Sequence, residues 1–255
     1  MGSHIYVDIH AHLYEYDYGF IASLFETYPN LVIVAVSDDL ESSKKTLELA
    51  QHFPSRIIPC LGLHPWEVGK VDNPVEEAKK IVELALDTKV VCLGEVGLDT
   101  KFVGHTIELQ RRVFNVFLEA ARDYNLFLNL HTAGTWEEVY RLLYHYDIEY
   151  ANFHWYTGPM SLLPQLRESN YTISINPAIR IQQKHRQIVD AADLDMMLTE
   201  SDSPYDYRGL KLKPSDVIDV VGEIAEIKGL DRDSVASELV NNLRRRLKPL
   251  AFLIP

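Results

Sequence analysis

The segment Val7-Asp8-Ile9-His10-Ala11-His12 decides how the rest of the chain is interpreted. It lies at the end of an apolar run, from Ile5 to Ile9, that is typical of a β-strand. Alternate residues of a strand point to one side, so Asp8, His10 and His12 are predicted to share a face. Two imidazoles and a carboxylate on one face are suitable ligands for a divalent metal ion. Short histidine motifs also occur without metal, so this interpretation depends on matching ligands from other strands.

The composition indicates a globular protein with a sizeable core. The 255 residues are 47% hydrophobic and 24% charged. No apolar run approaches the roughly 18 residues of a membrane span, and no signal peptide is visible. Cys60 and Cys92 lie in apolar, strand-like runs and are predicted to be buried thiols, which makes the cytoplasm the default compartment.

The net charge of −12 bears on possible partners. An acidic chain lacks the positive surface that coats long stretches of nucleic-acid backbone. Bound cations would reverse the local field, so the charge does not exclude an enzyme that holds one strand end. Neither a membrane nor an obligate protein partner is indicated.

Eight short apolar runs alternate with longer amphipathic stretches. The predicted strands are Ile5–His10, Leu31–Ser37, Arg56–Leu63, Val90–Glu95, Leu126–His131, Tyr150–His154, Tyr171–Ile175 and Met196–Glu200. The predicted helices are Leu40–His52, Pro74–Leu86, Ile107–Tyr124, Thr135–Tyr146, Ser161–Arg167, Gln183–Ala192, Ser215–Ile227 and Asp231–Leu247. This alternation predicts an α/β fold, a (β/α)8 TIM barrel formed as a single domain by residues 1–255. An open doubly wound sheet is the alternative.

Six of the eight predicted strands end in a histidine or a carboxylate. The residues are His10 and His12, His64, Glu95 and Asp99, His131, His154, and Glu200 and Asp202; the second and seventh strands offer only Asp38 and Asn176. The active site of a TIM barrel lies at these carboxyl ends, so the side chains are expected to converge. Gly62, Gly94 and Gly97 would let the backbone approach the site closely.

A carboxylate between imidazoles can bridge two cations, and Glu95 is the candidate bridge. His10, His12 and Asp202 are expected to complete one metal site, and His131 and His154 the other. Two cations about 3.5–4 Å apart can share an attacking hydroxide and neutralise the entering and leaving oxygens. The absence of cysteine from the set argues against a structural zinc site. One or two divalent cations (Mg, Mn or Zn) are therefore the expected cofactors.

The chain resembles the TatD-related DNase family of metal-dependent hydrolases, within the amidohydrolase-like barrels. The matching segments are D-I-H-A-H at 8–12, G-L-H-P at 62–65, G-E-V-G-L-D at 94–99, L-N-L-H at 128–131, F-H-W-Y-T-G at 153–158 and E-S-D-S-P at 200–204, with Gln110 and Phe114 on the helix after the fourth strand. The resemblance implies hydrolysis of phosphodiester bonds in DNA. It also implies that the metal ligands are His10, His12, Glu95, His131, His154 and Asp202, that Asp202 helps to activate water, and that His64 lies beside the substrate phosphate.

Several positions depart from the family pattern. Leu126-Phe127 replaces the usual proline before the fifth strand, Thr132-Ala133-Gly134 lacks the usual arginine after His131, Trp155-Tyr156 replaces Cys-Phe, Ser201 replaces threonine, and the asparagine before Pro214 is missing. All six expected ligands are present. Metal chemistry is therefore expected to be intact, while the missing arginine weakens the inference about the substrate.

The leading hypothesis is a divalent-metal-dependent phosphodiesterase, an exonuclease-type DNase acting on DNA ends or single-stranded DNA. Trp66, Trp155 and Tyr156 could stack an unpaired base, or could be packing residues at the barrel rim, and Arg208 could hold a phosphate or pair with a nearby acid. Asp8 is expected to lie below the ligands and orient an imidazole.

The alternative enzyme is an amidohydrolase that opens amide, ester or lactone bonds of a small molecule, and a non-catalytic barrel is a third possibility.

Overall fold

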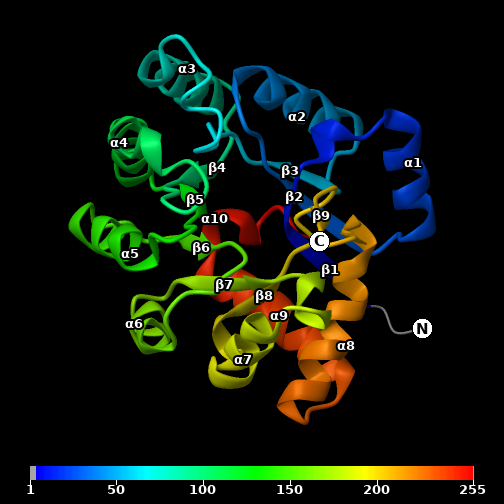
Figure 1. Cartoon of the computed structure of the whole chain (residues 1–255). Helices are drawn as coiled ribbons and strands as arrows, with labels where there is room; N and C mark the ends of the chain where they lie inside the picture. The colour runs from blue at the N-terminus through cyan, green and yellow to red at the C-terminus, as the bar shows by residue number, and fades with distance from the viewer. Residues whose placement is uncertain (1–3, 255) are drawn as a thin grey trace.

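A computed structural model describes residues 4–254 and has eight parallel strands in a ring (Figure 1). The strands are β1 (Tyr6–Ala11), β2 (Leu31–Ala35), β3 (Ile57–Pro59), β4 (Cys92–Gly97), β5 (Phe127–His131), β6 (Ala151–Phe153), β7 (Thr172–Ile175) and β8 (Met197–Thr199). They pair in chain order as β1-β2-β3 and β4 to β8. A parallel bridge between Leu61 and Leu93 joins the two groups, and the amide of Asp202 donates to the carbonyl of His10 to close the ring.

Helices surround this ring, which confirms the predicted (β/α)8 barrel. The larger helices are α1 (Tyr18–Thr27), α2 (Leu40–His52), α3 (Pro74–Asp87), α4 (Ile107–Tyr124), α5 (Trp136–His145), α6 (Leu163–Glu168), α7 (Gln183–Ala191), α8 (Val217–Lys228) and α9 (Arg232–Arg246). Eight of these match the predicted helices within a few residues. None of the helices between residues 4 and 254 combines the length and hydropathy that a bilayer span requires.

Two helices and a hairpin of the described chain were not predicted from the sequence. Helix α1 is rich in aromatic residues and begins after Asp17, whose side chain accepts the amide hydrogen of Phe20. A short antiparallel hairpin, β9 (Asp206–Tyr207) and β10 (Leu210–Lys211), follows β8. Helix α10 (Lys248–Ala251) ends the described chain and is seen through the ring of strands in Figure 1.

Side-chain hydrogen bonds at the helix ends differ from one helix to another. Asp231 caps α9 by accepting amide hydrogens from Asp233 and Ser234. Thr135 precedes α5 but does not cap it with its side chain, because its hydroxyl donates to the carbonyl of Leu98. Arg246, the last residue of α9, is buried and donates to the backbone carbonyl of Asp195.

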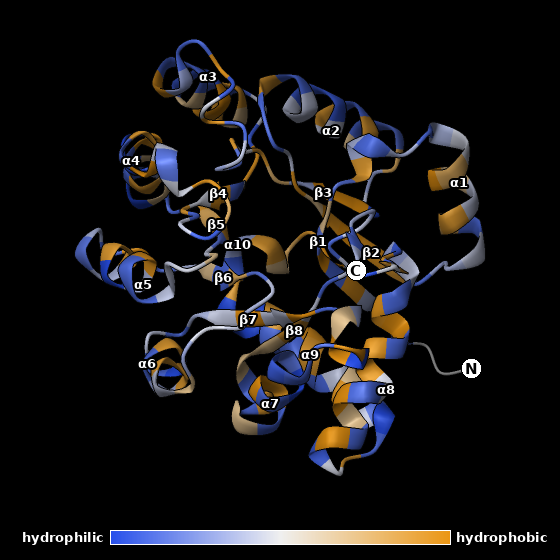
Figure 2. Cartoon of the chain, in the orientation of Figure 1, coloured by the Kyte–Doolittle hydropathy of each residue, from blue (hydrophilic) through white to orange (hydrophobic). Residues whose placement is uncertain are grey.

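The core occupies the spaces between strands and helices and the closed end of the ring. Figure 2 shows hydrophobic residues on the strands and on the sides of helices that face them. Leu247 and Leu250, at the end of the chain, pack in one cluster with Val7, Val32 and Ile58. This packing closes one end of the barrel and leaves the carboxyl ends of the strands for the site.

The two cysteines are joined, which corrects the expectation of free thiols. Cys60 follows β3 and Cys92 opens β4, and they form a disulfide with a Cα–Cα distance of 4.5 Å. The pairing of Leu61 with Leu93 places these neighbouring strands side by side, so the two sulfur atoms meet. The argument for a cytoplasmic location that rested on free thiols therefore no longer holds.

Candidate metal centre

The six predicted ligands converge at the carboxyl ends of five strands. The chain departs from regular pairing at two of these ends, because the register shifts between Asp8 and Ala11 in β1 and between Leu93 and Val96 in β4. Such irregularities redirect side chains and are common beside active sites. Because the shift in β1 lies between Asp8 and Ala11, regular strand alternation does not by itself relate the side chain of Asp8 to that of His10.

Glu95 lies at the centre of the cluster and is 2% exposed. Its Oε2 is 3.1 Å from His10 Nε2 and 3.5 Å from His12 Nε2. Its Oε1 is 2.7 Å from His131 Nδ1 and 3.4 Å from His154 Nε2. Each carboxylate oxygen thus faces a different pair of imidazoles, which is the arrangement that a bridging ligand requires.

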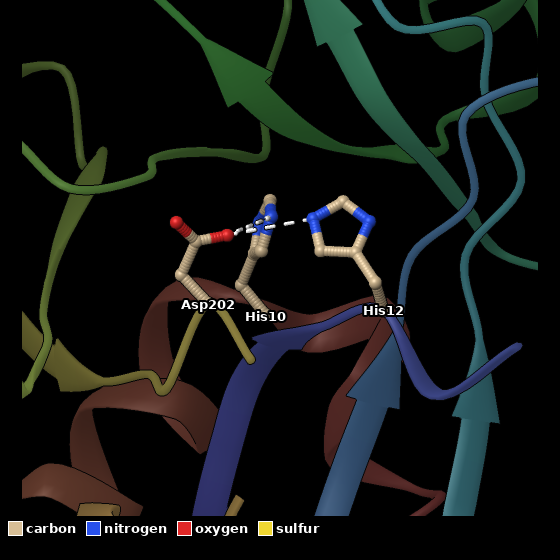
Figure 3. Close-up of side chains that lie close together, drawn as sticks. All are labelled: His10, His12 and Asp202. Atoms are coloured by element: carbon tan, nitrogen blue, oxygen red, sulfur yellow. Dashed lines mark ion pairs between the residues drawn. The ribbon is translucent and has the colours of Figure 1, made fainter. Parts of the chain in front are cut away.

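Asp202 joins the half of the cluster formed by His10 and His12 (Figure 3). Its Oδ1 lies 3.4 Å from His12 Nε2 and 3.7 Å from His10 Nε2. The residue has a φ of 53°, a left-handed conformation that aspartate tolerates better than most residues. These three side chains form one of the groups whose ligand atoms are close enough together to hold a metal ion.

Acceptor oxygens beside Nδ1 of His10 and His12 favour the neutral tautomer in which Nε2 faces Glu95 with a lone pair. The Oδ1 of Asn129 lies 3.1 Å from His10 Nδ1, and the Asn129 amide donates to the carbonyl of Ile9, which fixes the orientation of the amide. The Oδ1 of Asp38 lies 3.2 Å from His12 Nδ1. In a neutral imidazole the nitrogen facing an acceptor carries the hydrogen, so Nε2 of each ring is available as a ligand.

The other half of the cluster is oriented in the same way. Asp99 Oδ2 lies 3.0 Å from His131 Nε2, which leaves Nδ1 of that ring free to face Glu95. Glu200 Oε2 lies 3.3 Å from His154 Nδ1, which leaves Nε2 free. In their neutral forms the four imidazoles therefore direct lone pairs, together with carboxylate oxygens, at one small region, and this donor set fits divalent metal ions.

His64 has the opposite orientation. Its Nδ1 accepts the backbone amide hydrogen of Trp66 at 3.1 Å, so the ring hydrogen lies on Nε2. This Nε2 lies 3.3 Å from Glu95 Oε1 and 3.1 Å from His131 Nδ1. In this tautomer His64 is a hydrogen-bond donor directed into the site and has no lone pair to offer a metal there.

A family model described as TatD related DNase matches residues 7–248, nearly the whole chain. The chain belongs to the TatD-related DNase family. It is thereby placed among metal-dependent hydrolases. An uncharacterized metal-dependent hydrolase of Methanocaldococcus jannaschii is 27% identical over 95% of this chain and 98% of its own length.

Other relatives of the TatD-related family are more distant. Deoxyribonuclease TATDN3 of Homo sapiens is 24% identical over 97% of this chain and 96% of its own length. The crystal structure of the TatD homolog YJJV from Escherichia coli superposes with a TM-score of 0.81 at 23% identity, covering 93% of this chain and 96% of that one. This structural agreement shows the shared fold.

Charges in the metal-free site are strongly coupled. Burial would lower the pKa of His10, but the neighbouring carboxylates of Glu95 and Asp202 outweigh burial and raise it to about 9. For His131, burial is outweighed by Asp99 and Glu95, and its pKa is also raised to about 9. Burial would raise the pKa of Glu95, but the surrounding imidazoles hold it well below its usual range. Without metal, the cluster therefore holds protons at neutral pH.

Asp8 does not orient an imidazole, which corrects that expectation. Its Oδ1 accepts the amide hydrogens of His10 and Ser201, at 3.2 and 2.8 Å. Burial raises the pKa of Asp8 to about 8. Asp8 therefore ties β1 to the segment after β8 beneath the ligands, while Asn129 orients the ring of His10.

A cavity of about 630 Å³ opens above the cluster. Trp66, Trp155 and Arg208 line it, as the substrate-binding prediction requires, together with His64. Tyr156 is misplaced in that prediction: it is fully buried, and its hydroxyl donates to the carbonyl of Pro159 at 2.6 Å. The left-handed backbone of Trp155, with a φ of 41°, turns the chain so that the next side chain enters the core.

The residues that orient the imidazoles were not predicted from the sequence. Asn129 precedes His131 by two positions on β5, so their shared face was a usable signal. Asp99 and Glu200 stood at strand ends but had no stated partner. The role of Asp38 could not be predicted, because nothing in the sequence reveals that the end of β2 lies beside His12.

Proposed function

We propose that this protein is a divalent-metal-dependent phosphodiesterase that removes nucleotides from the ends of single-stranded DNA. The observation that carries the proposal is the set of four imidazole nitrogens divided between the two oxygens of Glu95. Such a two-sided cluster suits a pair of cations acting on both sides of one phosphate. The deoxyribonuclease name of a human relative supports DNA as the substrate.

The ligand assignment follows the two halves of the cluster. His10, His12 and Asp202 would hold one cation and His131 and His154 the other, with Glu95 shared. When bound, Mg, Mn or Zn would supply Lewis-acid charge and a water of lowered pKa. Asp202 is 8% exposed at the cavity floor, so its second oxygen is available to orient that water.

Other groups on the cavity wall suit a phosphate with an attached nucleoside. The Nε2 hydrogen of His64 would donate to a non-bridging phosphate oxygen. Arg208 lines the cavity and forms no ion pair with any residue between 4 and 254, so its charge is available to the substrate. Trp66 and Trp155 offer aromatic faces on which an unpaired terminal base would stack.

An amidohydrolase acting on a small amide, ester or lactone is the second candidate. The observation that favours it is the negative charge of the cavity wall, where Arg208 and Lys101 face the carboxylates of Glu15, Asp38, Glu67, Glu95, Asp202 and Asp206. The loop after His131 adds only Thr132 and Ala133 to this wall. A neutral substrate would meet less repulsion there than a polyanion.

End-labelled single-stranded DNA, tested with Mg, Mn or Zn beside a panel of lactones, esters and amides, separates the two candidates. We expect stepwise cleavage of DNA, reduced by at least about a hundredfold in Asp202→Asn. Asp123→Asn, an exposed acid at the end of α4, is the matched control and should retain activity. Lactone turnover with uncut DNA would reverse the ranking.

A further inference from the structure

Two groups of aromatic side chains face the cavity from different loops. Trp66, after β3, and Phe102, after β4, contact edge to face with ring centroids 5.7 Å apart. Trp155, after β6, contacts Tyr205 and Tyr207, after β8, at centroid distances of 6.0 and 5.1 Å. Phe102 is 59% exposed and Tyr205 43% exposed, although both lie beside a largely buried polar site.

Barrel topology places the two groups across the metal cluster from each other. The ring runs in chain order from β1 to β8, so β4 and β8 are separated by four positions and lie on opposite sides. The loop with Phe102 extends from one side, and the β9–β10 hairpin with Tyr207 extends from the other (Figure 1). Glu95 and Asp202, which come from the ends of these two strands, meet between them at the cavity floor.

Each aromatic group carries one cation. Lys101 Nζ lies 5.0 Å from the centroid of the Phe102 ring, and Arg208 Cζ lies 5.2 Å from that of Tyr207. Neither cation forms an ion pair with a residue in the described range 4–254. The other charged side chains of the wall that are not histidines are carboxylates. The cavity therefore has a positive charge beside an aromatic face at each of two opposite edges and negative charge between them.

We propose that the cavity binds a single strand across its whole width, with one base on the Trp66–Phe102 wall and the neighbouring base on the Trp155–Tyr205–Tyr207 wall. Lys101 and Arg208 then contact the phosphates that flank the phosphate at the metal cluster. Stacked bases of a duplex cannot occupy both walls, so an unpaired dinucleotide unit is the unit recognised. This inference rests on the proposed function and adds to it that the bases on both sides of the reacting phosphate are bound.

Binding and cleavage of short thymidine strands test the proposal with the full-length chain. The probes are a fluorescein-labelled trinucleotide with a terminal phosphate, which supplies three consecutive phosphates, and two versions with an abasic residue on either the 5′ or the 3′ side of the bond that is cut. Binding is read by anisotropy with the Asp202→Asn variant and Mg, and cleavage with the unmodified enzyme. We expect each abasic residue to weaken binding by about 5- to 150-fold, the range typical of one stacked base.

The variants Phe102→Leu and Tyr207→Leu assign each wall to one base. We expect each variant to become insensitive to a different abasic position while it remains sensitive to the other. Tyr144→Leu, which removes a 76% exposed ring on α5, is the matched control and should respond like the parent protein. The proposal would be overturned if the parent protein were sensitive to only one abasic position. It would also be overturned if both variants became insensitive to the same abasic position.

The two readouts separate this inference from the proposed function. Cleavage with a base required on one side only would refute the two-wall arrangement and leave the phosphodiesterase in place. Binding that requires both bases without cleavage would support the two walls and refute the nuclease. A protein that neither binds nor cuts the strands would refute both.

Discussion

Asp99 connects the metal cluster to the cavity wall through a single oxygen. Its Oδ2 lies 3.0 Å from His131 Nε2 and accepts the indole hydrogen of Trp66 at 2.7 Å. Backbone donors from Lys101 and Phe102 occupy its Oδ1. Together these contacts hold the pKa of Asp99 at about 2, against the opposing effect of burial, so the carboxylate is ionised at neutral pH.

Asp99→Asn should weaken metal binding in the half of the cluster that contains His131. An amide presents its NH2 group or a less basic oxygen to the ring, so the tautomer with a free Nδ1 loses its support. We expect a loss of about 10- to 100-fold in affinity for one of two metal equivalents, measured by calorimetry. Asp123→Asn serves as the control. Unchanged affinity of both equivalents would show that Asp99 does not orient His131.

Proton competition should make metal binding depend on pH. His10 and His131 have pKa values of about 9 without metal and are protonated at pH 7, whereas a metal ligand must be a neutral imidazole. Apparent metal affinity should therefore rise as the pH increases from about 6.5 to 9, with protons released on binding. Calorimetry in two buffers of different ionisation enthalpy measures this release. A heat independent of the buffer would contradict the expectation.

Strands β4 and β5 approach each other so closely that a side chain cannot be accommodated at Gly97. A Cβ atom there would collide with the carbonyl oxygen of His131, and the φ of +146° is also unfavourable for other residues. This close approach brings the end of β4, with Glu95, alongside His131. The glycine thus contributes to the geometry of the metal centre through the backbone.

Gly97→Ala should destabilise the protein far more than Gly104→Ala. At Gly104 the nearest atom to an added methyl group would be Thr100 Cβ at 4.0 Å, an ordinary contact. We expect Gly97→Ala to lower the free energy of unfolding by about 2–5 kcal/mol, from overpacking and backbone strain together. Urea denaturation of the two metal-free variants measures the difference. Equal midpoints would mean that the strands can separate at no cost.

The elements and most candidate ligands could be predicted because they depend on local pattern. Parallel strands end on one side of a barrel, so the terminal residues Glu95 and His131 were expected to meet without any knowledge of contacts. The register shift in β1, the joining of Cys60 to Cys92 and the inward turn of Tyr156 depend on how neighbouring strands are aligned. Such alignment is set by packing across the barrel, which a single sequence does not reveal.

Metal should stabilise the whole molecule, because its ligands come from five strands around the ring. At a free metal concentration of about 100 times the dissociation constant, binding adds about 2.7 kcal/mol to the free energy of unfolding. For a chain of this size that corresponds to a rise of roughly 5–11 °C in Tm. Scanning calorimetry with metal and with a chelator measures it.

The increase in Tm that metal binding causes should be larger at higher pH. The raised pKa values of His10 and His131 contribute stability to the metal-free protein that is present below about pH 6.5 and is lost as the pH passes 9. Metal binding strengthens over the same range, so the gap between loaded and metal-free protein widens. A gap that stays constant between about pH 6.5 and 9 would contradict this account.

One oxygen of Asp99 contacts both Trp66 in the cavity wall and His131 in the metal centre. Ligand binding at the wall and metal binding at the centre are therefore thermodynamically linked. Glu200 makes a related connection on the opposite side, where one oxygen accepts the backbone amide hydrogen of Trp155 and the other faces His154. A ligand that shifts either tryptophan also shifts the partner of a metal-binding imidazole. By reciprocity, the factor by which metal changes the affinity for that ligand equals the factor by which the ligand changes the affinity for metal.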